Sequence, residues 1–279
     1  MQTILEILNK SISYFQSKGV PNAKLDAQCL LAGALNCKRL ELFLRFEEPL
    51  TGENLDKVRD FVRRRARREP LQYILGKTDF FGISIKCDDR ALIPRQETEN
   101  LCDILATKYF TDEHAALDIL ELGVGSGAVS LALKDHFKSA KVFGVDKSPQ
   151  ALSLARENAA ELGLEADFRE SDWFEKVEGK YDLIFANPPY LTDAEVSSAQ
   201  PEVSRFEPIL ALRSDDGGIA DLRKILSAAP DFLKDGALIA CECGILHPKV
   251  LAEEFGKTYS KIEVLPDMSG RMRYILCRK

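Results

Sequence analysis

The sequence predicts an α/β protein with a mostly parallel, doubly wound sheet, preceded by a small all-helical domain and a β-hairpin linker. Three observations lead to this prediction. Residues 1–75 show only helical periodicity, residues 76–94 change to short alternating strands, and strands alternate with helices beyond residue 115. Such alternation is typical of parallel strands joined by right-handed crossovers. The expected divisions are therefore a helical domain (1–75), a hairpin linker (76–94) and a catalytic-type α/β domain (95–279).

The first 75 residues contain several helices. Apolar side chains keep helical spacing from Ile4 to Phe15, and the following Gly-Val-Pro-Asn stops that helix. A second helix begins near residue 26, a third covers about residues 39–46, and a fourth, capped by Thr51, runs to Arg68. The fourth carries six arginines, which form either a solvated face or a patch facing an acidic or RNA-associated partner.

The remaining elements follow in order. Residues 80–86 alternate around a glycine turn, which predicts the hairpin, and a helix is expected near residues 97–108, with Thr98 in its first turn. Strands are expected at 116–122, 141–146, 166–169, 181–186, 236–242, 261–264 and 273–277. The intervening helices are expected at 127–137, 149–162 and 221–233.

Composition narrows the class of protein. The 279 residues are 45% hydrophobic and 29% charged, as in ordinary globular proteins, and the net charge of -6 argues against a general nucleic-acid-binding surface. The seven cysteines include no CxxC pair, and Cys241-Glu242-Cys243 lies in an apolar strand-like run, so we expect buried thiols and no metal site. No apolar run reaches the roughly 18 residues that a membrane helix needs. We expect a cytoplasmic monomer.

The strongest local signal is Asn187-Pro188-Pro189-Tyr190, which directly follows the apolar run 181–186. Neither proline can continue a sheet ladder or enter a helix interior, so the strand must end at Asn187. The result is a stiff loop that holds a carboxamide, a backbone carbonyl and an aromatic ring beyond the carboxyl end of a strand. Open α/β sheets bind their ligands at such ends. An isolated Asn-Pro is more often a simple turn, but here a glycine-rich loop lies upstream.

That loop, Gly123-Val124-Gly125-Ser126-Gly127, follows a strand ending in Glu121-Leu122 and opens a helix. Its G-x-G-x-G spacing differs from the G-x-G-x-x-G of dinucleotide sites. Asp146 ends the second strand, where an acid takes ribose hydroxyls. The pattern favours a nucleoside-type cofactor, and S-adenosylmethionine fits because its sulfonium replaces the phosphates. Asp172 is a weaker candidate for the adenine amino group.

The same residues carry a family resemblance that extends along nearly the whole chain. The glycine loop, Asp146, Asp172 and the Asn-Pro-Pro-Tyr box resemble class I S-adenosylmethionine-dependent methyltransferases, with a Rossmann-like fold and seven strands. The box alone is shared with N(6)-adenine DNA methyltransferases. The segments 19–26, 68–76, 80–82, 93–99 and 205–208 resemble more specifically the release factor glutamine methyltransferase family (HemK/PrmC). Two departures are Gln96, where the family usually has proline, and Glu121, where Asp is common.

The resemblance implies N(5) methylation of the glutamine in the Gly-Gly-Gln loop of bacterial class I peptide-chain release factors. It implies the following cofactor contacts: Glu121, Gly123, Val124, Gly125, Ser126, Gly127, Asp146, Lys147, Asp172, Trp173 and Asn187. It implies catalytic and substrate-binding roles for Asn187, Pro188, Pro189 and Tyr190. No direct contact with nucleic acid is expected.

The residue chemistry agrees with this implication. An amide nitrogen is a poor nucleophile because its lone pair is delocalised. We expect the Asn187 oxygen and the Pro188 carbonyl to accept the amide hydrogens, the Asn187 NH₂ to hold the substrate carbonyl, and the Tyr190 ring to cover the amide. The alternatives are a ribosomal-protein glutamine methyltransferase, a nucleic-acid adenine methyltransferase, and a non-enzymatic cofactor-binding module. A non-enzymatic cofactor-binding module would not explain the presence of the Asn-Pro-Pro-Tyr box.

Overall fold

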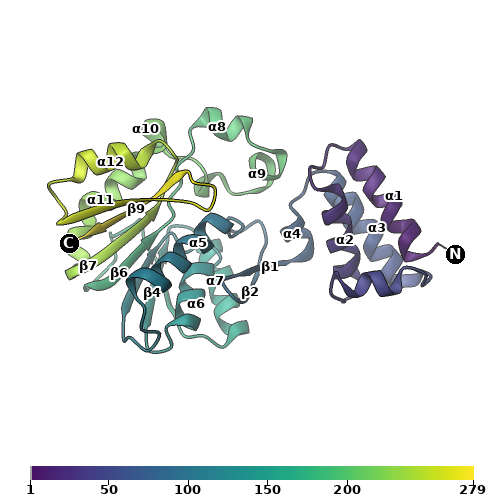
Figure 1. Cartoon of the computed structure of the whole chain (residues 1–279), viewed down its shortest axis with the longest axis horizontal. Helices are drawn as coiled ribbons and strands as arrows, with labels where there is room; N and C mark the ends of the chain where they lie inside the picture. Colours follow the sequence, from purple (N-terminus) through teal and green to yellow (C-terminus); the bar gives the residue numbers. More distant parts are fainter. Residues whose placement is uncertain (1) are drawn as a thin grey trace. The chain divides into compact units, whose positions relative to one another are not determined.

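The computed structural model describes residues 2–279 and divides into two compact units (Figure 1). The first contains the residues up to Lys77 together with the segment Gln200–Phe206, and the second contains Thr78–Ala199 and Glu207–Lys279. The domains that the sequence predicts run along the chain without interleaving. The first unit, by contrast, also takes in a segment from far downstream.

The first unit is helical. Its elements are α1 (Ile4–Ser17), α2 (Ala23–Ala34), the 3₁₀ turn η1 (Glu41–Arg45), α3 (Gly52–Ala66), α4 (Leu71–Leu75) and α9 (Pro201–Phe206). A core that includes Phe15, Leu30 and Leu42 joins α1, α2 and η1.

Two details of this unit differ from the sequence-based expectation. The α-helix expected over about 39–46 is the short 3₁₀ turn η1. Thr51 precedes α3 but makes no side-chain capping hydrogen bond, and the next residue, Gly52, has a left-handed φ of +59°.

The arginines of α3 are divided among several ion pairs. Arg65 is buried and contacts both Asp26, at 2.7 Å, and Glu202, at 2.8 Å. Arg68 reaches the other oxygen of Glu202 at 2.6 Å. These arginines hold the segment Gln200–Phe206 within the helical unit, so the basic run is not one solvated face.

The second unit contains a seven-stranded sheet in the order β5-β4-β3-β6-β7-β9-β8. Its strands are β3 (Asp118–Leu122), β4 (Lys141–Asp146), β5 (Asp167–Glu170), β6 (Tyr181–Ala186), β7 (Leu233–Glu242), β8 (Lys261–Pro266) and β9 (Met272–Arg278). Six of these strands run in one direction, and β9, between β7 and β8, runs in the opposite direction. This confirms the predicted mostly parallel, seven-stranded sheet.

Helices cover both faces of this sheet (Figure 1). On one face lie α5 (Gln96–Ile104), which continues into the π-helical turn η2 (Leu105–Tyr109), α6 (Ala128–His136) and α7 (Pro149–Leu162). On the other lie α11 (Ala220–Phe232) and α12 (His247–Phe255), which bury the main apolar core against β3, β6 and β7. Cys241 and Cys243 are buried, as the sequence predicts, and Cys277 on β9 is buried as well. Within residues 2–279, no helix has the length and apolar character needed to cross a membrane.

Two further segments lie beside the sheet. The hairpin strands β1 (Lys77–Phe80) and β2 (Ile83–Lys86) form a separate two-stranded sheet. Buried Asn158 on α7 accepts the Lys86 N–H and donates to the carbonyls of Lys86 and Ser126, so α7 fixes β2 beside the glycine loop. After β6 the chain forms the short helices α8 (Asp193–Ser198), η3 (Ile209–Ala211) and α10 (Asp215–Gly218).

The parallel register places the candidate residues at one edge of the sheet. Leu122, the last residue of β3, pairs with Val145 on β4 and with Ala186 on β6. The residues that follow, Gly123, Asp146 and Asn187, therefore leave the sheet side by side.

Candidate active site

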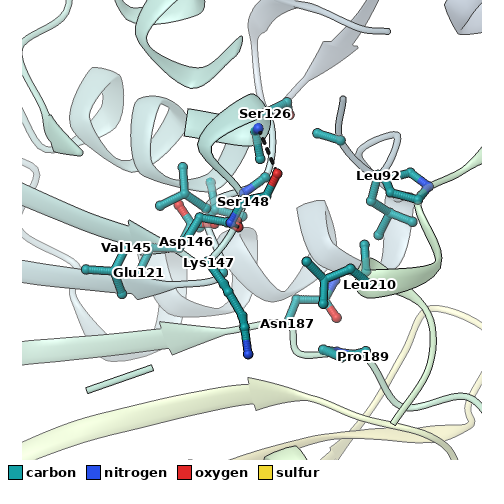
Figure 2. Close-up of a pocket in the computed structure, with 18 of the residues that line it drawn as sticks. Leu92, Glu121, Ser126, Val145, Asp146, Lys147, Ser148, Asn187, Pro189 and Leu210 are labelled. Atoms are coloured by element: carbon teal, nitrogen blue, oxygen red, sulfur yellow. Dashed lines mark hydrogen bonds between the residues drawn. The ribbon is translucent and has the colours of Figure 1, made fainter. Parts of the chain in front are cut away.

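A cavity in the second unit opens at this edge of the sheet (Figure 2). Glu121, Asp146 and Lys147 lie on one side of it, and Asn187, Pro189 and Leu210 lie on the other (Figure 2). Most of the predicted site residues line it: Glu121, Gly123, Val124, Gly125, Ser126, Asp146, Lys147, Asp172, Trp173, Asn187 and Pro189. Gly127, Pro188 and Tyr190 are not part of its lining.

The glycine loop has the backbone conformation that its glycines allow. Gly123, Gly125 and Gly127 all have left-handed φ, of +79°, +55° and +82°. A Cβ on Gly127 would lie 3.2 Å from both Ala155 and Leu131. Gly127 thus serves the close packing of α6 against α7, while Gly123 and Gly125 leave bare backbone at the cavity.

Asp146 binds the glycine loop from the end of β4. Its Oδ2 accepts the Gly125 N–H at 2.8 Å, and its Oδ1 accepts the Ser148 N–H at 2.8 Å. Burial raises the pKa of this carboxyl, and the backbone N–H groups partly oppose the rise. A carboxylate accepts about four hydrogen bonds, so Asp146 keeps acceptor capacity for two hydroxyls.

Glu121 is a buried carboxyl at the floor of the cavity. Ser130 donates to its Oε2 from both the backbone N–H, at 2.9 Å, and the hydroxyl, at 2.5 Å. Among the residues that the structure describes, no donor reaches Oε1. Burial raises the pKa of Glu121 to about 8, so the unliganded site favours the protonated carboxyl. A cation bound at Oε1 would favour the ionised form.

Asp172 and Trp173 line the cavity beside Lys147 and the glycine loop. Asp172 forms an exposed ion pair with Lys147 at 2.6 Å. The Trp173 ring covers Gly123, and its indole N–H donates to Asp221 Oδ1 at 3.2 Å. Asp221 also lines the cavity, and sequence reasoning found in it only the first residue of a helix.

Asn187 directly follows β6 and is half-buried, and a hydrogen bond within the protein holds its carboxamide. Its Nδ2 donates to the hydroxyl of Thr98 on α5 at 2.9 Å. The Thr98 hydroxyl in turn donates to Glu242 Oε2 at 2.7 Å. One hydrogen of the Asn187 NH₂ is thus used inside the protein, although the sequence led us to expect that this group holds the substrate carbonyl. Thr98 lines the cavity, and its sequence signal was only that of a first-turn residue.

Tyr190 is anchored at the other end of the same loop. Its hydroxyl donates to Glu242 Oε1 at 3.0 Å and accepts from Arg273 Nη1 at 3.3 Å. Burial, together with the Glu242 carboxylate, raises the pKa of the phenol well above its usual range. This anchoring turns the hydroxyl toward β7 and β9, away from the cavity.

A glycine turn supports the Tyr190 backbone. Asp216, Gly217 and Gly218 all have left-handed φ. A Cβ on Gly218 would lie 2.2 Å from the Tyr190 carbonyl oxygen. Only glycine lets this turn approach the loop so closely.

The cavity fits S-adenosylmethionine. Asp146 has spare acceptors for ribose hydroxyls, Glu121 has an oxygen for a cationic group, and the Gly125 backbone lies bare at the cavity. Val124 and Trp173 supply apolar walls.

Comparison with known proteins identifies the family of the chain. The family model for the PrmC N-terminal domain matches residues 6–76, and the model for the methyltransferase small domain matches residues 98–202. A solved structure, a 16S rRNA methyltransferase from T. thermophilus in complex with AdoMet and guanosine, is 18% identical with a TM-score of 0.54, and the match covers 73% of this chain and 49% of that one. It supports the fold alone.

Two curated relatives are more similar, and both are called release factor glutamine methyltransferase. The protein of Geobacter sulfurreducens is 38% identical over 92% of this chain and 89% of its own length. That of Deinococcus radiodurans is 35% identical over 98% of both chains. The resemblance inferred from the motifs is confirmed: the chain belongs to the release factor glutamine methyltransferase family.

Proposed function

We propose that this enzyme methylates the side-chain amide nitrogen of the glutamine in the Gly-Gly-Gln loop of bacterial class I peptide-chain release factors. Family membership and the names of the relatives support this substrate. The helical domain (1–75) recognises the substrate, residues 76–94 link it, and residues 95–279 perform the methyl transfer. The enzyme acts as a cytoplasmic monomer, without direct contact with nucleic acid.

S-adenosylmethionine, when bound, supplies the methyl group from a sulfonium, whose sulfur is a good leaving group. Asp146 accepts the ribose hydroxyls, and Glu121 pairs with the cationic amino group through Oε1. Asp172 and Trp173 hold the adenine. To bind it, Asp172 gives up its exposed ion pair with Lys147. Gly123, Gly125 and Ser126 provide the backbone wall.

The chemical problem that the chain solves is the weak nucleophilicity of an amide nitrogen. Conjugation with the carbonyl withdraws the lone pair, and a rotation barrier of roughly 18–20 kcal/mol reflects its strength. Acceptors aimed at the amide hydrogens favour a nitrogen that carries positive charge. Asn187 Oδ1 fills this role from the cavity wall. The Pro188 carbonyl, which does not line the unliganded cavity, is the second proposed acceptor, and Pro189 keeps the loop stiff.

The observation that carries this assignment is the orientation of Asn187. Because Nδ2 faces Thr98, the opposite side of the planar carboxamide, Oδ1, is the side left for a substrate donor. The methylated nitrogen carries an acidic proton, which leaves to water, so no general base is required.

Mass spectrometry tests the proposal. Purified release factor is incubated with the enzyme and methyl-labelled cofactor, and the labelled peptide is sequenced. We expect one methyl group on the Gly-Gly-Gln glutamine and none in a release factor that carries glutamate there. Ribosomal proteins and adenine-containing DNA or RNA serve as parallel substrates. Labelling of one of these, with unlabelled release factor, would replace the proposed function by one of the alternatives.

A further inference from the structure

Behind Asn187 lies a chain of hydrogen bonds whose direction can be assigned. We propose that Glu242 is a positioning residue that, through the Thr98 hydroxyl, holds the Asn187 carboxamide with Oδ1 toward the cavity. The inference rests on the proposed function of Asn187 and adds the group that sets its orientation.

Counting donors gives the direction of each bond. An ionised carboxylate only accepts, so the single hydroxyl hydrogen of Thr98 must point to Glu242. Thr98 can then only accept from its other neighbour. Asn187 must present its NH₂ to Thr98, and its oxygen must face the opposite way.

Glu242 acts from a distance. It is the last residue of β7, the residue is only 1% exposed, and it does not line the cavity. Thr98, at 5% exposure, lies between it and Asn187. Glu242 therefore cannot reach a substrate, and its effect on the reaction must pass through the side chains that it binds.

The same carboxylate also binds the far end of the loop. Its Oε1 accepts from Tyr190, whose hydroxyl accepts from Arg273. Burial raises the pKa of Glu242, and the hydrogen bonds from Thr98 and Tyr190, together with the charge of Arg273, oppose the rise and favour the ionised carboxylate. Glu242 thus holds Tyr190 directly through Oε1 and Asn187 indirectly through Oε2 and the Thr98 hydroxyl, which favours one loop conformation over others.

A neutral group at this position would remove the directionality. In Glu242→Gln, the Tyr190 hydroxyl, which accepts from Arg273, still needs an acceptor for its own hydrogen. The carboxamide oxygen therefore stays at Tyr190, and the NH₂ turns toward Thr98. Because the NH₂ then donates to Thr98, the freed hydroxyl hydrogen of Thr98 points to Asn187 and favours a flipped Asn187 with Nδ2 in the cavity. Such a flip places a donor where the reaction needs an acceptor.

A double-mutant cycle tests the inference, with release factor as substrate and kcat as readout. Thr98→Val removes the hydroxyl at nearly constant shape, and we expect kcat to fall about 10-fold to 100-fold with cofactor affinity unchanged. Thr98→Ser restores the hydroxyl and should recover most of the lost rate. Thr107→Val is the matched control, because its hydroxyl bonds only the Asp103 carbonyl on the surface.

The decisive comparison uses Asn187→Ala. Since Thr98 acts only through Asn187, adding Thr98→Val to Asn187→Ala should lower kcat by no more than about twofold. Hydrogen exchange of the Asn187 side-chain NH₂, followed by NMR, should become faster in Thr98→Val and stay slow in Thr98→Ser. Folded Glu242→Gln should lose at least as much turnover as Thr98→Val.

The outcomes distinguish the positioning role of Glu242 from the proposed function of the enzyme. A wild-type kcat in Thr98→Val or in folded Glu242→Gln, or a full additional loss in the double mutant, overturns the positioning role while Asn187→Ala stays slow. If wild-type enzyme leaves release factor unmethylated, or Asn187→Ala turns over normally, the proposed function itself has failed.

Discussion

The buried carboxyl of Glu121 makes cofactor affinity depend on pH. The pKa of Glu121 is raised to about 8 by burial, so the unliganded site is mostly protonated at neutral pH. A cationic amino group at Oε1 requires the ionised form, so binding must release this proton. For one proton and this pKa, the dissociation constant should fall about fiftyfold from about pH 6 to about pH 8.

The stability of the unliganded protein should change in the opposite direction. The folded-state pKa of Glu121 lies above its ordinary value of 4.5, so protonation of this carboxyl stabilises the folded form. The stabilisation is fully present below about pH 4.5. This contribution is lost as the pH rises from about 4.5 to about 8. Chemical unfolding should show a larger loss over this range in wild type than in Glu121→Gln, because other buried carboxyls with a raised pKa, such as Asp146, remain in the variant.

Calorimetry with S-adenosylhomocysteine, in buffers of different ionisation enthalpy, measures both the affinity and the released proton. The matched ligand is 5′-methylthioadenosine, which lacks the amino acid group and should bind with little dependence on pH. Glu121→Gln should bind S-adenosylhomocysteine with a dissociation constant that stays within about twofold over the same range. An equal slope in wild type and Glu121→Gln would refute the assignment of Glu121.

Three further predictions concern other parts of the chain. Asp146→Ala should weaken cofactor binding by roughly 1.5–3 kcal/mol, the range for hydrogen bonds to a charged group, and unchanged affinity by calorimetry would remove Asp146 from the site. Gly218→Ala should lower turnover while cofactor binding persists, because the new Cβ displaces the Tyr190 carbonyl; unaltered steady-state kinetics would contradict this. Arg65→Ala should destabilise the helical unit by about 3–5 kcal/mol, because Asp26 stays buried beside an empty position, and an unchanged urea midpoint would show that the pair is dispensable.

Much of the α/β unit could be predicted because its elements end at strong local signals. The strand Lys141–Asp146, the helix Pro149–Leu162 and the strand Tyr181–Ala186 have the predicted bounds. Pro149 in the first turn of this helix fixes its start, and Pro188 and Pro189 fix the end of the strand Tyr181–Ala186. The glycine loop, Asp146 and Asn187 then follow from the parallel register.

Other features could not be predicted because they depend on contacts distant in sequence. Thr98 and Glu242 lie 144 residues apart, and their hydrogen bond has no local signature. Gly218 has its role only because the Tyr190 carbonyl approaches it. Helix α12 (His247–Phe255) follows a buried strand without a strong cap and was not predicted.

The central claim is that the oriented carboxamide of Asn187 stabilises positive charge on the substrate nitrogen. Its most direct test is the single-turnover rate of methyl transfer to release factor by Asn187→Ala, with cofactor saturating. The account predicts a fall of roughly 10²–10³, the scale for one preorganised transition-state hydrogen bond, with cofactor affinity unchanged and a smaller loss in Pro189→Ala. A near-wild-type rate in well-folded Asn187→Ala would contradict it.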